Sequence, residues 1–216
     1  MVKNGFKVMD SDIHLVEPPE LWERYMEAEF KERGPRIGVA EGSGPGSIVF
    51  TIDGQTVDYK DSSMVVTSNS LTTGFQELPA RQRQARIRAQ RLTERAAVEG
   101  RAALTGREAG DGTDPKNMLA AMRVEGIDMA IVFRTFGAHV LAFDAKDGMD
   151  GALAAAICRA YNNWARDYCN EAPDVLKLAT LIPAHDVDEA VKEVRRSVKE
   201  LGSVALILPS QSVNER

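Results

Sequence analysis

The sequence predicts an α/β protein built on a parallel sheet. From Thr113 to Leu208 the chain alternates three helix patterns with three strand patterns. Such alternation is typical of parallel strands joined by crossover helices. A further strand opens the chain, and the irregular stretch of about residues 20–112 separates it from the alternating part. We interpret that stretch as a long insertion in a single domain spanning residues 1–216.

The opening strand is expected over residues 6–14, where apolar and polar side chains alternate. A period of two residues is the pattern of a β-strand with two different faces. Glu17-Pro18-Pro19 follows it, and proline ends a strand because it cannot donate a hydrogen bond to the neighbouring strand.

The insertion contains weaker patterns. Residues 20–30 can form a short helix, and residues 38–46 are a glycine-rich loop. Residues 48–59 predict a β-hairpin, because Asp-Gly between two β-rich runs favours a tight turn. Residues 81–104 are rich in arginine, glutamine, alanine and glutamate, which favours a helix.

The alternating part is more regular. Its strongest helix, over residues 150–171, has apolar side chains at intervals of three and four, as an amphipathic helix requires. A helix before it begins at Thr113 or Asp114 and ends at Gly126, and a helix after it begins at Asp186 and ends at Gly202. The strands expected between and after these helices cover residues 128–133, 176–183 and 203–208.

Each helix is expected to bury an apolar face. The expected face of the first helix is Met118, Met122 and Val124; that of the second is Leu153, Ile157, Tyr161, Trp164 and Tyr168; and that of the third is Ala190, Val191, Val194, Val198 and Leu201.

Composition narrows the class of protein. The 216 residues carry 27 Lys and Arg against 32 Asp and Glu, a formal net charge of −5. This acidic balance argues against a nucleic-acid-binding protein, which carries a basic excess. The sequence has no apolar run long enough to span a membrane and no signal-peptide pattern at Met1, so we expect a cytoplasmic protein. Cys158 and Cys169 are expected on one helix roughly 16 Å apart, too far to form a disulfide.

Candidate metal ligands lie at the end of the opening strand. Asp10, Asp12 and His14 have the i, i+2, i+4 spacing that places side chains on one face of a strand. Carboxylate and imidazole are ligand types that suit zinc or manganese. Alternatively, the aspartates only cap loops and His14 is a hydrogen-bonded core residue.

Four segments together resemble the amidohydrolase-related family, which contains metal-dependent hydrolases and decarboxylases similar to aminocarboxymuconate semialdehyde decarboxylase. VMDSDIHLVEPPELWERYM resembles the first-strand signature of that family. The segments EGIDMAIVFRTFG, AYNNWARDYCNEAPDVLKLATLIPAHD and EAVKEVRRSVKELGSVALIL resemble its following strands and helices, in the same order.

The resemblance implies the N-terminal half of a distorted TIM (β/α)8 barrel, because four core strands are visible and a complete barrel has eight. It also implies one divalent metal at the carboxyl ends of the strands, held in part by Asp12 and His14. Asp12 stands where the family usually has histidine, which moves the preference toward manganese, although zinc stays ahead. The remaining ligands and the general acid or base would lie outside this chain.

Three further residues are candidates around that site. Arg134 could bind a substrate carboxylate through two hydrogen bonds, or brace a loop on the surface. His185 could line the pocket, or lie on the surface where a helix begins. Glu17 could support a metal ligand from behind, or cap the Pro-Pro loop. His139 follows the second core strand.

The expected activity is hydrolysis or non-oxidative decarboxylation of a small carboxylate. The unpaired edges of a half-barrel would favour association, so we expect a homo-oligomer, with no nucleic acid and no membrane as partner. The alternative is a non-catalytic α/β domain that binds a partner through its helical face or through the arginine-rich segment Arg81–Arg107. As a helix, that segment is expected to cover the barrel mouth or to form a dimer contact.

Overall fold

The computed structural model describes residues 5–15, 17–18, 20–39, 48–57, 113–134, 149–209 and 213. Its main sheet has four strands in the order β1-β5-β6-β7, and every neighbouring pair is parallel. The strands are β1 (Met9–His14), β5 (Met129–Phe133), β6 (Leu176–Leu181) and β7 (Ala205–Ile207). The sheet curls as half of a TIM barrel does, so the predicted fold class is confirmed.

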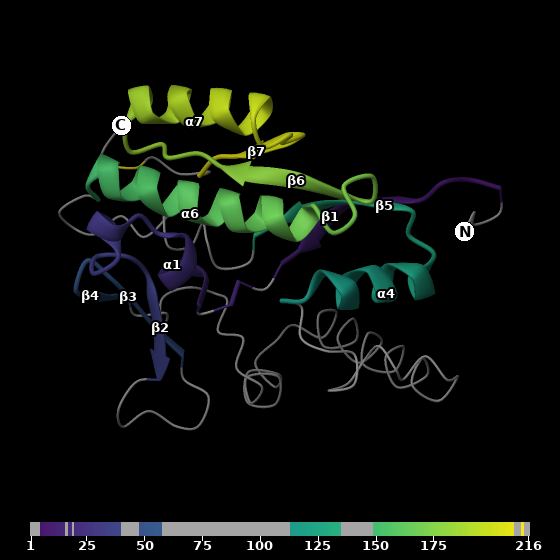
Figure 1. Cartoon of the computed structure of the whole chain (residues 1–216), viewed down its shortest axis with the longest axis horizontal. Helices are drawn as coiled ribbons and strands as arrows, with labels where there is room; N and C mark the ends of the chain where they lie inside the picture. The colour runs from purple at the N-terminus through teal and green to yellow at the C-terminus, as the bar shows by residue number, and fades with distance from the viewer. Residues whose placement is uncertain are drawn as a thin grey trace, which may run out of the picture.

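Helices connect these strands (Figure 1). α4 (Pro115–Glu125) precedes β5, α6 (Gly151–Cys169) lies between β5 and β6, and α7 (Val187–Lys199) lies between β6 and β7. α6 runs alongside β6 and packs on it, while α7 lies beyond α6 and α1 (Glu20–Tyr25) packs on the other side of α6. A short 3-10 helix, η1 (Ala28–Phe30), follows α1.

Each connecting helix begins at an aspartate. Asp114, Asp150 and Asp186 each accept a hydrogen bond from a backbone N–H of the first turn, which satisfies a donor that has no partner inside the helix. α4 ends at Gly126, whose φ of 74° lies in the left-handed region where a side chain would be strained. The sequence predicted Asp186 and Gly126 correctly and left Thr113 open as an alternative to Asp114.

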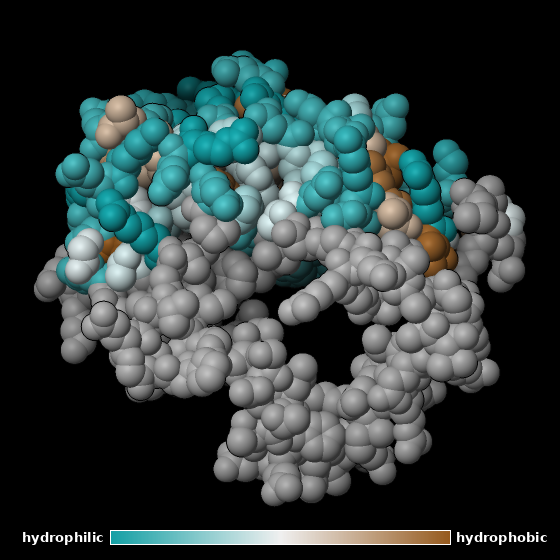
Figure 2. Space-filling view, turned by 60° about the horizontal axis from the view of Figure 1, so that its bottom comes forward, coloured by the Kyte–Doolittle hydropathy of each residue, from teal (hydrophilic) through white to brown (hydrophobic). Residues whose placement is uncertain are grey.

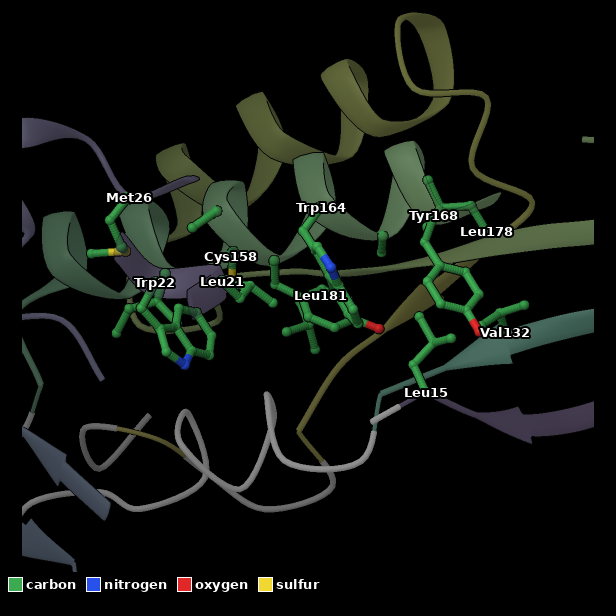
Figure 3. Close-up of a cluster of buried hydrophobic side chains, with 14 of the residues drawn as sticks. Leu15, Leu21, Trp22, Met26, Val132, Cys158, Trp164, Tyr168, Leu178 and Leu181 are labelled. Carbon is green, nitrogen blue, oxygen red and sulfur yellow. The ribbon is translucent and has the colours of Figure 1, made fainter. Parts of the chain in front are cut away.

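The core lies between α6 and the sheet (Figure 3). The predicted apolar stripe of α6 is buried along its whole length. Figure 3 shows Tyr168 of this stripe directed toward Leu15 and Val132. Leu15 directly follows β1, and Val132 lies in β5. Cys158 and Cys169 are buried and unpaired, as expected. Burial raises the pKa of the Cys169 thiol to about 12, which makes it a poor nucleophile at neutral pH.

The insertion forms a second, antiparallel sheet of β2 (Arg36–Val39), β3 (Ile48–Ile52) and β4 (Gln55–Val57). The hairpin turn at Asp53-Gly54 has positive φ at both positions, 51° and 74°, as the favoured two-residue turn requires. The predicted hairpin is therefore confirmed. The loop predicted to begin at residue 38 is wrong there, because residues 38–39 pair with β3. The helix expected over residues 81–104 lies outside the described residues.

Two predicted helix faces are only partly buried. Val124 of α4 is exposed, although Met122 is buried as expected. On α7, Val191 and Val198 are exposed, and the side facing the protein carries Glu193 and Ser197 instead. The apolar face predicted for α7 is therefore only partly buried: Val191 and Val198 are exposed, whereas Ala190, Val194 and Leu201 are partly buried.

A buried polar network explains why Glu193 and Ser197 lie on the inward side of α7. The Asn162 side chain of α6 accepts a hydrogen bond from the N–H of Leu181 (2.7 Å) and donates to its carbonyl oxygen (2.9 Å), as a neighbouring strand would. It also donates to Oε1 of Glu193 on α7 (2.6 Å). Arg196 donates to both carboxylate oxygens of Glu193 and to Asn163. These bonds hold α6, α7 and the end of β6 together.

Replacing Asn162 with alanine should lower the free energy of unfolding by about 3 kcal/mol, because it leaves the polar groups of Leu181 and Glu193 buried without this partner. Urea denaturation followed by circular dichroism measures the change. Asn163→Ala is the matched control and should cost about 1 kcal/mol or less, since it removes one partly buried hydrogen bond. Equal losses for the two variants would contradict the role assigned to Asn162.

Candidate metal centre

A β-bulge shapes the end of β1. Asp10 pairs with Ala130 and Ile13 pairs with Val132, so three steps along β1 match two steps along β5. Oδ1 of Asp10 accepts a hydrogen bond from the N–H of Asp12 at 2.9 Å, inside the bulge. Such a bulge bends the strand locally and redirects the side chains beyond it. The simple alternation expected from Asp10 to His14 is therefore interrupted.

The side chains of Asp12, inside the bulge, and His14, just after it, lie close together. Oδ1 of Asp12 is 3.3 Å from Nε2 of His14. The two side chains are 77% and 52% exposed, respectively, so both retain access to solvent. A carboxylate oxygen and an imidazole nitrogen at this separation can face one divalent cation together.

The main-chain carbonyl of Arg134 fixes the His14 ring. Nδ1 of His14 is 2.6 Å from this oxygen, which can only accept, so Nδ1 carries the proton and donates it. In the neutral ring Nε2 then has the free lone pair that a metal ligand needs. The pairing of His14 with Phe133, the last residue of β5, places Arg134 beside the ring.

The donor set fits a metal only in part. Within the described ranges there is no group of three His, Cys, Asp or Glu side chains close enough to hold a metal ion. Three protein ligands are usual for a catalytic zinc. Asp12 and His14 therefore fit as two ligands of a larger set.

The other candidate residues follow the carboxyl ends of three strands of the sheet and are buried or partly buried. Glu17 follows β1, Arg134 follows β5 and His185 follows β6. The side chains of Glu17 and His185 are almost completely buried, as is Nε of Arg134. The surface alternative for His185 is therefore wrong. Carboxyl ends of parallel strands are where ligands bind in barrel folds.

Tyr161 lies near Glu17 and Arg134, although the sequence predicted it only as part of the apolar face of α6. Its ring is fully buried on α6, and its hydroxyl has no hydrogen-bond partner among the described residues. Burial raises the pKa of this hydroxyl well above its ordinary value; the negative charge of Glu17 raises it further and the charge of Arg134 opposes the rise. The three groups are thus electrostatically coupled, a relation that apolar periodicity cannot reveal.

His139 and the Arg81–Arg107 segment lie outside the described residues. No helix in the described ranges has the length and apolar character needed to cross a membrane.

Comparison with known proteins gives structural neighbours. No protein-family model matches the chain, and no curated protein gives a significant match. An amidohydrolase structure from Mycobacterium avium subsp. paratuberculosis K-10 aligns with 93% of this chain at a TM-score of 0.58 and 20% identity. This chain has an amidohydrolase-like fold. It covers 48% of the neighbour, about half of that protein's length.

Two structures of 2,6-dihydroxybenzoate decarboxylase are also similar over a shorter stretch. One contains 2,6-dihydroxybenzoate and is 28% identical; the other, from Rhizobium, is 26% identical. Each alignment covers 44% of this chain and 28% of the decarboxylase, with a TM-score of 0.39. The resemblance to the amidohydrolase-related family, predicted from four sequence segments, is thus confirmed at the level of fold by the Mycobacterium structure.

The hydrogen bond to Arg134 predicts the tautomer of His14. In the neutral form of its ring, His14 should carry its proton on Nδ1, because only that tautomer donates to the carbonyl oxygen. Two-bond nitrogen–proton NMR correlations of the ring identify the protonated nitrogen, and His14→Gln assigns the signals. A neutral His14 protonated on Nε2 would contradict this geometry.

Proposed function

We propose that this chain carries part of a divalent-metal site of an amidohydrolase-like enzyme, with Asp12 and His14 as two of the metal ligands. The single observation that carries the proposal is the arrangement of these side chains: they lie 3.3 Å apart at the carboxyl end of β1, and the Nδ1 hydrogen bond of His14 leaves Nε2 available. The amidohydrolase-like fold supports it.

Zinc is the proposed metal, ahead of manganese, because histidine is among the preferred ligands of zinc and one carboxylate is compatible with it. When bound, such a metal polarises a carbonyl or activates water. The remaining ligands and the general acid or base would come from residues other than the described ones.

The proposed reaction is hydrolysis or non-oxidative decarboxylation of a small carboxylate. Arg134 is the proposed carboxylate-binding residue, because a guanidinium can donate two parallel hydrogen bonds to a carboxylate. His185 would line the same pocket, since it follows the next strand of the sheet. The buried carboxylate of Glu17 would support the ligands electrostatically from behind. We further propose that the protein acts in the cytoplasm as a homo-oligomer, without a nucleic-acid or membrane partner.

The metal site is tested by zinc titration of the purified chain. Asp12→Asn and His14→Ala should each weaken zinc binding at least tenfold, because each removes a proposed ligand. Isothermal titration calorimetry measures the zinc affinity of each variant.

Asp174→Asn is the matched control, because Asp174 is an exposed aspartate in the turn between α6 and β6. It should leave the zinc affinity unchanged. Zinc affinity that is the same in all three variants would exclude Asp12 and His14 as ligands and would favour the alternative of a non-catalytic binding domain.

A further inference from the structure

Tyr161, Glu17 and Arg134 form a cluster of polar side chains inside the protein. Most of the coloured surface in Figure 2 is hydrophilic, as expected for residues that favour contact with water. Tyr161 and Glu17 are instead 0% and 2% exposed, and Nε of Arg134 is buried as well. Buried polar groups are normally held by hydrogen bonds, so each member of this cluster needs a partner.

The hydroxyl of Tyr161 is the group whose partner is missing. It is buried and makes no hydrogen bond to any described residue. Its helix, α6, packs on the sheet through a largely apolar layer of side chains (Figure 3). A hydroxyl buried there without a partner is unfavourable, and phenylalanine would fill the same space without that cost. The hydroxyl therefore indicates a further hydrogen-bonding partner.

Two charged groups from other segments act on this hydroxyl. Burial and the negative charge of Glu17 raise its pKa, whereas the positive charge of Arg134 lowers it. Neither group is hydrogen-bonded to it directly. A carboxylate only accepts hydrogen bonds and a guanidinium only donates them, whereas a tyrosine hydroxyl does both. A molecule that joins all three must also do both, and buried water commonly has this role in proteins.

We propose that Tyr161 is a positioning residue for His14, and that a buried water molecule links its hydroxyl to the side chains of Glu17 and Arg134. The water accepts hydrogen bonds from the hydroxyl and the guanidinium and donates one to the carboxylate, so each group takes the role that its chemistry allows. Three polar partners are typical of a buried water.

Both charged residues are connected to His14. Glu17 follows it by three residues on the same segment, and the carbonyl oxygen of Arg134 lies 2.6 Å from Nδ1 of its ring. A water-mediated contact with α6 therefore restrains the segment that carries the imidazole and the residue that orients it. The consequence for metal binding rests on the proposed function, whereas the contact itself does not.

The positioning role is tested with Tyr161→Phe, which removes only the hydroxyl. In the metal-free protein, the ring nitrogen chemical shifts of His14 should change, because the restraint on its surroundings is lost. Zinc binding should weaken about tenfold, the lower end of the range for residues that support a metal ligand. Nitrogen–proton NMR correlations and isothermal titration calorimetry measure the two effects, and circular dichroism checks that the helices persist.

Tyr25→Phe is the matched control. The Tyr25 hydroxyl donates to Oδ2 of Asp167 at 3.0 Å, outside the cluster. The same chemical change should therefore leave the His14 shifts and the zinc affinity as they are in the unmodified chain. Unchanged His14 shifts in Tyr161→Phe, or equal changes in both variants, would overturn the positioning role.

A crystal structure of the unmodified chain tests the water directly. We expect an ordered water within hydrogen-bond distance of the Tyr161 hydroxyl and of a Glu17 carboxylate oxygen. A hydroxyl that is bonded directly to another side chain, or that has no neighbour, would overturn this part of the proposal. An unmodified chain that binds no zinc would instead contradict the proposed function. The His14 shifts and the water, both observed without metal, would then still decide whether Tyr161 positions His14.

Discussion

The pairing of β1 with β5 is the constraint on which the candidate site depends. It places Phe133 opposite His14 and so brings the carbonyl oxygen of Arg134 within 2.6 Å of the ring. The bulge between Asp10 and Ile13 is part of the same pairing, because the extra residue determines which side chains of β1 share a side. A one-residue change of register would move Asp12 and His14 to the other face of the sheet. The orientation of the imidazole is thus set by the sheet's register, and only indirectly by the residues around the ring.

The sequence predicted the elements of the sheet and the helices that join them, because their signals are local. Caps such as Asp186 act within one helical turn, and the apolar stripe of α6 repeats at the helical period. The side of α7 that faces the protein could not be predicted in this way. Periodicity locates the valines on one face, but the hydrogen bonds of Asn162 and Glu193 decide which face packs inward. The buried polar network therefore rotates α7 so that Val191 and Val198 are exposed, a result that depends on a partner 31 positions away.

The candidate site was predictable to a similar extent. The spacing of Asp12 and His14 and their place at a strand end follow from the sequence, and the structure brings the two side chains together. The bulge and the Arg134 carbonyl contact were not predictable, because both arise from pairing between segments 120 residues apart. Tyr161 was assigned to the core for a related reason: its position in an apolar stripe says nothing about the charges of Glu17 and Arg134, which reach it from two other elements.

The exposure of the site and the openness of the sheet have one physical origin. A TIM barrel places its ligands at a mouth that strands surround on all sides, whereas four strands surround half of it. Asp12 and His14 are consequently open to water, while Glu17 and His185 are already buried by the described elements. Electrostatic interactions strengthen as water is excluded, so the proposed ligands would hold a cation more strongly if water were excluded from around them. β1 is both an edge strand of the described sheet and the source of both candidate ligands.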